Sequence, residues 1–218
     1  MKRFALSLLL LVSLALPAAA QTYYDVGVDL PEYPEMQPIP ESPVYYAPGV
    51  DSNYFFYDGA YWDYYNDGWY SSPWYNGPWE YVDPVYVPTY ILWVPIVYYH
   101  HPHSHWHGWD AHRPPHWSQH WGRDWQTRHN AVYAGRSVGN VQRAPLPQYQ
   151  QRFNRQNYPR GIQQSQLHGQ FYNYQPREMV TRQAYQNRGI GMAQNLQHSQ
   201  PQAQGQGHHG ENRNPAAR

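Results

Sequence analysis

Histidine is the residue type whose number and spacing in this chain could do chemistry. Nine of the 13 histidines lie between residues 100 and 129. On an extended backbone, where side chains alternate, one side would carry His101, His103, His105 and His107. On a helix, a spacing of four would place on one face His112, His116, His120 and Asp124.

Neutral imidazole is a good ligand for Cu, Ni and Zn, so these three metals are the candidate cofactors. The candidate ligands are His101, His103, His105, His107, His112, His116 and His120. The chain has no cysteine and no His-Glu-x-x-His motif, so no spacing dictates a closed tetrahedral site. Two alternatives stay open. The tryptophans between the histidines equally fit a packed amphipathic edge, and protonation below neutral pH would draw this segment towards acidic residues 21–100.

Aromatic residues offer a second kind of site. In a stretch rich in Ser, Pro and Gly, a candidate binding patch consists of Trp69, Trp74, Tyr75 and Trp79. Such rings could stack on a sugar or meet a protein partner. The alternative, which the scarcity of aliphatic residues favours, is that these rings form the core of a small domain.

The motifs for enzymatic chemistry are weak, and we expect no enzyme. The acids available as paired carboxylates are Asp58, Asp63, Asp67 and Glu80, but Asp58 and Asp67 lie in expected turns, which explain them sufficiently. Residues 135–139 match the pattern G-x-S-x-G, but the acid and histidine that should follow fall only in a Gln-rich stretch.

The elements that would position these residues begin with an aromatic β-domain over residues 51–99. Asp58-Gly59 between aromatic runs predicts a tight hairpin, which pairs Phe56 with Tyr61 and Phe55 with Trp62. Further strands are expected at residues 81–87 and 89–99, the latter buried. Residues 100–130 form a His/Trp-rich segment, in which Trp117, Trp121 and Trp125 predict a short helix with an indole stripe.

The flanks differ in composition from this centre. Residues 1–20 have a basic start, an apolar run and a small-residue end, which predicts a signal peptide. Residues 21–50 are expected to be an acidic, Pro-rich linker, and residues 131–218 a Gln/Arg-rich disordered tail with short helical stretches near 148–155 and 180–197. The expected fold is therefore a small mainly-β domain, an antiparallel aromatic meander plus a short helix, with extensive disorder at both ends.

Charge is distributed unevenly along the chain. Residues 21–100 contain eleven acids and no Arg or Lys, whereas residues 101–218 contain thirteen arginines and four acids. The two halves should attract each other, or each should attract a partner of opposite sign. The expected partners are anionic envelope polymers, carbohydrate or protein, without specific nucleic-acid binding and without a membrane span after signal cleavage.

Four segments together resemble a group of uncharacterised exported bacterial proteins with an aromatic-rich β segment, a Gly-Pro-Trp element and a Gln-rich tail. They are residues 57–62, 76–79, 94–99 and 116–125. The resemblance spans residues 44–130 and implies a location in the periplasm, on the outer envelope or outside the cell. We therefore expect an exported, non-enzymatic structural or interaction module, or alternatively a histidine-rich binder or buffer of Cu, Ni or Zn.

Overall fold

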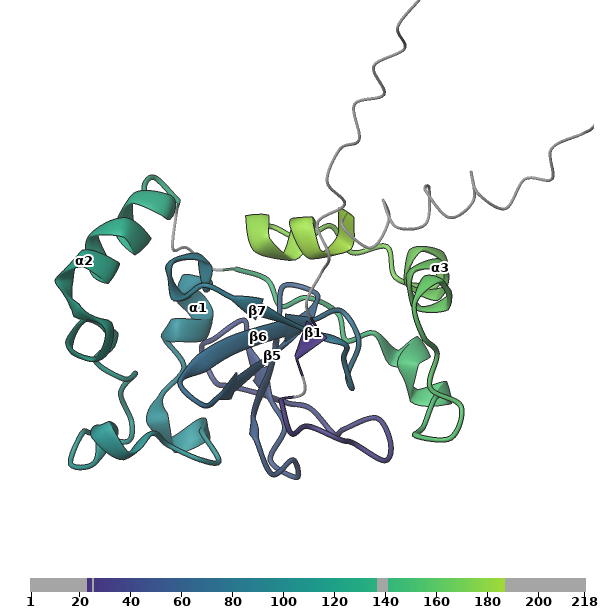
Figure 1. Ribbon diagram of the computed structural model, residues 1–218, viewed down its shortest axis with the longest axis horizontal. Helices are drawn as coiled ribbons and strands as arrows, with labels where there is room; N and C mark the ends of the chain where they lie inside the picture. Colours follow the sequence, from purple (N-terminus) through teal and green to yellow (C-terminus); the bar gives the residue numbers. More distant parts are fainter. Residues whose placement is uncertain (1–22, 25, 137–140, 187–218) are drawn as a thin grey trace, which may run out of the picture.

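An antiparallel sheet of seven strands lies at the centre of the computed structural model, which describes residues 23–24, 26–136 and 141–186 (Figure 1). The expected signal peptide and residues 187–218 of the expected tail lie outside the described residues. In chain order the strands are β1 (Tyr23–Tyr24), β2 (Gln37–Pro38), β3 (Tyr45–Tyr46), β4 (Asn53–Tyr57), β5 (Ala60–Tyr65), β6 (Gly68–Ser72) and β7 (Trp79–Val82). Their order across the sheet is β1-β7-β6-β5-β4-β3-β2. The fold is a small, mainly β domain, as the sequence predicts.

Tight turns set the register of the central strands. Asp58 and Gly59 have φ values of 52° and 84°, the left-handed conformations that a two-residue hairpin turn of this kind needs. The predicted pairs are confirmed: Phe55 lies opposite Trp62, and Phe56 opposite Tyr61. A second two-residue turn joins β5 to β6, and it places Asp67 at φ 60°.

Aromatic side chains alternate between the two faces of the sheet, so each face carries its own core. Phe55 and Trp62 belong to the first aromatic cluster, whereas Phe56 and Tyr61 belong to the second. All four are fully buried. Each cluster needs a cover, and two different parts of the chain supply it.

Helical segments after β7 cover the first cluster. They are η1 (Pro84–Tyr86), α1 (Thr89–Leu92), η2 (Ile96–Tyr98), η3 (Ser104–Trp106) and α2 (Trp117–Val132). The prediction of strands over residues 81–87 and 89–99 is wrong beyond β7, although Ile91 and Leu92 are buried as expected. Prolines explain the difference: Pro88 and Pro95 immediately precede helical turns, and proline cannot donate to a sheet ladder.

The predicted tryptophan helix is present as α2, and it is longer than expected. The rings of Trp117 and Trp121 stack with centroids 4.5 Å apart, and Trp121 lies 5.0 Å from Trp125. Gly122 interrupts the helix with φ 85° and ψ 172°, which makes a kink between two helical halves.

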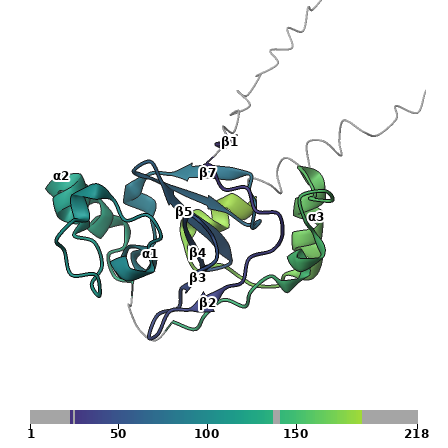
Figure 2. The ribbon, with the colours of Figure 1, turned by 90° about the horizontal axis from the view of Figure 1, so that it is seen from below.

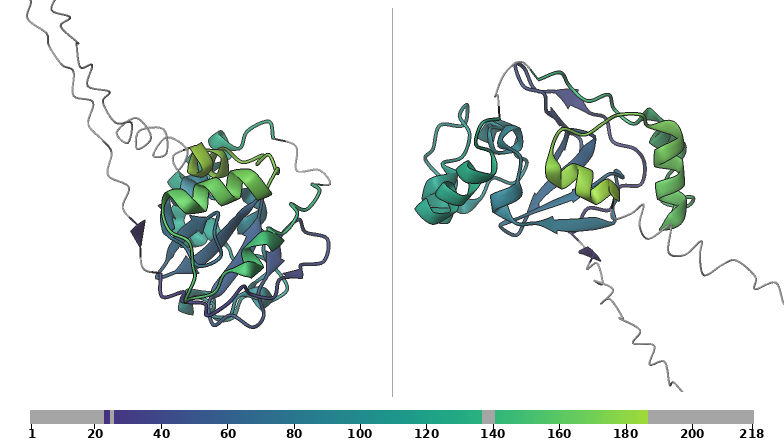
Figure 3. Two further views of the ribbon diagram at one scale, coloured as in Figure 1. Left: turned by 90° about the vertical axis from the view of Figure 1, so that its right-hand side faces the viewer. Right: turned by 90° about the horizontal axis from the view of Figure 1, so that it is seen from above.

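Residues 141–186 cover the second cluster, so this part of the expected tail is ordered. It contains η4 (Gln148–Arg152), α3 (Ile162–Phe171) and helical residues 179–186. Figure 3 shows α3 on the opposite side of the sheet from α1 and α2. Gln150 donates to the carbonyl of Pro73 (2.8 Å), and Gln164 to that of Gly77 (3.1 Å). These buried amides bind main-chain groups, which composition alone does not reveal.

Residues 26–50 were expected to be a flexible linker, and the structure differs here too. Strand β3 pairs with β4, and β2 continues the sheet as its edge (Figure 2). Val26, Ile39 and Val44 are buried in the two aromatic clusters. Pro38 fits at the edge because an edge strand leaves donors unused.

Candidate functional site

Three histidines meet where η3 approaches α2. One ligand atom from each of His103, His105 and His120 lies within 4.8 Å of the others, so this group could hold a metal ion. The ring centroids of His103 and His105 are 4.7 Å apart, and those of His103 and His120 are 4.9 Å apart. His105 is exposed, so the group opens to solvent on one side.

Asp67 orients the most buried of these imidazoles. Its Oδ1 lies 2.5 Å from Nε2 of His120, whose side chain is only 4 % exposed. Nδ1 of His120 is buried and has no hydrogen-bond partner among the described residues. If Nε2 carries the proton that Asp67 accepts, Nδ1 is the nitrogen left with a free lone pair. A carboxylate behind a metal-binding histidine usually fixes the tautomer in this way.

The electrostatics favour an ionised Asp67. Burial opposes ionisation, but hydrogen bonds from Tyr64 and His120 outweigh it and lower the pKa of Asp67. Tyr64 donates to the same Oδ1 at 2.6 Å. Burial, followed by the neighbouring imidazole of His120, lowers the pKa of His103. A lowered pKa favours the neutral imidazole, which is the form that binds metals.

Local hydrogen bonds and packing position His103 and His105. The backbone N–H of His105 donates to Nδ1 of His103 at 3.2 Å, which leaves Nε2 of His103 for a ligand. Trp106, between them and the sheet, is 3 % exposed and stacks on Tyr64 with centroids 5.5 Å apart. The loop is tied to β4 because Asn53 exchanges two hydrogen bonds with the backbone of His101.

Of the seven predicted ligands, three are therefore brought together. The 3-10 turn η3 breaks the extended register expected for residues 101–107, and α2 begins at Trp117, after His112 and His116. His101 pairs instead with Asp51 at 2.7 Å, and His116 stacks on Trp109 at 4.7 Å. His107 and His112 are exposed.

Asp67 is a residue of the candidate site that the sequence does not reveal. It was interpreted as a turn residue, which it is, but its carboxylate also serves the histidine cluster. Asp67 and His120 are 53 residues apart in the sequence. Only the pairing of β5 with β6 and the docking of α2 bring them together, so no local pattern could have shown the contact.

The candidate aromatic patch is not at the surface. Trp69, Trp74, Tyr75 and Trp79 are all at most 3 % exposed, so the structure agrees with the alternative that these rings are core. Tyr75 donates its hydroxyl to the carbonyl of Phe153 at 2.8 Å. Trp74 likewise donates its indole N–H to the carbonyl of Gln164 at 3.2 Å, so these two rings help to hold residues 141–186 against the sheet.

Comparisons with protein-family models, curated proteins and solved structures found no match. In the described part of the chain, no helix combines the length and apolarity that a membrane crossing requires. Residues 137–140, which include the serine of the G-x-S-x-G pattern, lie outside that part.

Proposed function

We propose that this protein is an exported, non-enzymatic module that binds one divalent transition-metal ion through His103, His105 and His120. The observation that carries this proposal is the arrangement at His120: a carboxylate holds one ring nitrogen, the other is buried without a partner among the described residues, and a ligand atom of the ring lies within 4.8 Å of ligand atoms of His103 and His105. If the histidines only formed a packed amphipathic edge, a buried Nδ1 without a partner at His120 would not be expected.

The donor set favours Zn, Cu(II) or Ni over other metals. Imidazole nitrogen suits these three ions, whereas Ca and Mg require oxygen ligands and Cu(I) favours sulfur. Three protein ligands leave at least one coordination position open. His105 is exposed, so an ion could enter and leave without unfolding of the domain. These features suit a carrier or buffer of the metal.

The proposal is tested by calorimetric titration of the metal-free protein with Zn²⁺, Ni²⁺ and Cu²⁺ at pH 7.5. We expect one ion per chain. The double variant H103N/H105N should lose this binding, and Asn at position 103 keeps an oxygen that can accept from the N–H of residue 105. The matched control is H107N/H112N, which removes two exposed histidines outside the cluster and should bind as the parent does.

Asp67→Asn tests the role of the carboxylate. Asn tolerates the positive φ at this position, so the turn should survive. Loss of a carboxylate that hydrogen-bonds a metal-binding histidine lowers metal affinity by about 10–100-fold. We expect Asp67→Asn to lower the affinity by a factor in that range. Weak binding of several ions, reduced equally by both double variants, would contradict the proposal.

A further inference from the structure

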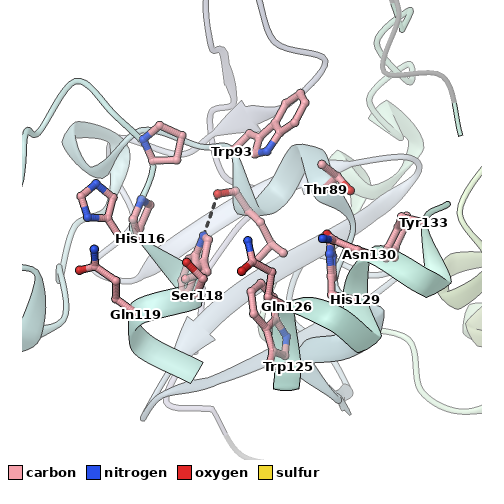
Figure 4. A pocket seen from close by; sticks show the side chains of 14 residues that line it. Thr89, Trp93, His116, Ser118, Gln119, Trp125, Gln126, His129, Asn130 and Tyr133 are labelled. Carbon is pink, nitrogen blue, oxygen red and sulfur yellow. Dashed lines mark hydrogen bonds between the residues drawn. The ribbon is translucent and has the colours of Figure 1, made fainter. Parts of the chain in front are cut away.

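A pocket lies between α1 and α2, separate from the histidine cluster. Its volume is about 730 Å³, within the range of small-molecule sites. Figure 4 shows Trp93 on one side of this hollow and Gln119 and Gln126 on the other. We call it the α1–α2 pocket; both helical halves of the kinked α2 contribute to it, with Ser118 before Gly122 and Asn130 after it.

The α1–α2 pocket carries no formal charge apart from its two imidazoles. None of the residues that line it is Asp, Glu, Lys or Arg. A phosphate, a carboxylate or an ammonium group would lose water there without gaining a counter-charge. The lining therefore selects against anionic polymers, and it fits an uncharged ligand.

An exposed ring and polar side chains without hydrogen-bond partners among the described residues both line the pocket. The Trp93 side chain is 50 % exposed. The side-chain amides of Gln119, Gln126 and Asn130 are exposed, and they make no hydrogen bond to any described residue. Each amide offers both a donor and an acceptor.

Among the buried groups of the lining residues, one indole N–H has no partner in the described part of the chain. Nε1 of Trp125 is buried without a partner in the described part of the chain, and Trp125 is 7 % exposed. Its neighbours are satisfied: Trp117 donates to the carbonyl of Leu92 at 2.7 Å, and His129 bonds to that of Val87 at 3.0 Å.

We infer that the α1–α2 pocket binds a neutral oligosaccharide. A sugar ring offers an apolar C–H face that can lie on Trp93, and hydroxyl groups that both donate to and accept from the amides. An apolar or proline-rich peptide would cover the ring but would leave most of the amides unpaired. The inference is independent of the metal site, because none of its three histidines lines the pocket.

The test uses the full chain in the presence of a metal chelator, which separates this site from the histidine cluster. Calorimetric titration with tetrasaccharides of N-acetylglucosamine, of β-linked glucose and of α-linked glucose should show binding of at least one. W93A and Q126A should each weaken that binding by about tenfold or more. The control Y81A removes an aromatic ring of similar exposure (46 %) at the sheet, and it should leave the affinity unchanged.

Two results would overturn the inference. One is the absence of binding by all three tetrasaccharides to a parent protein that is shown to be folded by its cooperative unfolding. The other is tight binding of a proline-rich peptide that W93A abolishes, with no saccharide competing for the site. Both results leave the metal proposal untouched.

Discussion

Asp63 is a fully buried carboxylic acid at the centre of the sheet. Ser52 donates to its Oδ1, and Oδ2 has no hydrogen-bond partner among the described residues. Burial, only partly offset by the Ser52 bond, raises the pKa of Asp63 to about 7. The folded protein therefore holds this acid in its neutral form well above the pH at which it ionises in the unfolded chain.

The sign of the pH dependence follows from that shift. Between about pH 4 and 7 the unfolded chain loses the proton while the folded protein keeps it, so this group destabilises the fold increasingly as pH rises, by up to about 1.4 kcal/mol per pH unit. Asp63→Asn removes this titration. In urea unfolding at pH 4, 6 and 8, the variant should gain stability over the parent as pH rises.

The control for that series is Glu35→Gln, which changes an exposed acid. The pH dependence that is specific to Asp63 is the difference between these two variants. A difference between Asp63→Asn and the parent that stays constant from pH 4 to 8 would show that Asp63 ionises normally in the fold.

At the scale of elements, the kink in α2 depends on one residue. Gly122 has a backbone conformation that is essentially restricted to glycine, yet a Cβ there would meet no atom within 4 Å. Gly122→Ala should therefore cost on the order of 1–3 kcal/mol through backbone strain alone. Alternatively the helix straightens, and the α1–α2 pocket is lost with it.

Gly169→Ala in α3 is the matched control. That glycine is helical and also has open space around it, so alanine there should stabilise the protein by about 0.5–1 kcal/mol. Thermal unfolding of both variants measures the contrast. If the two substitutions had equal effects, the kink would not be a property of the folded protein.

At the scale of elements, the sequence predicts those features that depend on neighbouring residues alone. Asp58-Gly59 specifies a turn, and the turn determines which aromatic residues pair across β4 and β5. The strand expected at residues 89–99 failed because apolar content does not distinguish a buried strand from short buried helices. The histidine cluster was half predicted: residue type indicated the seven candidate ligands, but which three come together depended on how η3 and α2 dock on the sheet.

At the scale of the molecule, residues 26–50 and residues 141–186 complete the core, although the composition of both segments predicted a linker and a disordered tail. Arg155 bonds Asp29 at 2.8 Å, so part of the basic half does meet the acidic half of this chain. Asp58 accepts hydrogen bonds from Tyr174 and from the backbone of Arg177 and Glu178. Order in these segments depends on partners about 120 residues away, which no window of sequence contains.

Removal of the chain after residue 136 should therefore unfold more than the part removed. It would expose the cluster around Trp74 and Tyr75, and the burial of each such ring contributes about 1.5–3 kcal/mol. We expect loss of a cooperative unfolding transition, followed by circular dichroism. The control variant is Tyr81→Ala, which removes an exposed ring from β7 and should keep the cooperative transition.

The two edges of the sheet have a consequence for the behaviour of the protein at high concentration. The central strands read NYFFY, AYWDYY and GWYSS, sequences that would readily recruit another chain if they lay at an edge. Both edges are instead strands of two residues, β1 and β2, and the second contains Pro38. Edge strands this short leave few unpaired N–H and C=O groups for a strand of a neighbouring molecule to bond. We therefore expect the protein, although rich in tyrosine and tryptophan, to resist edge-to-edge association at high concentration.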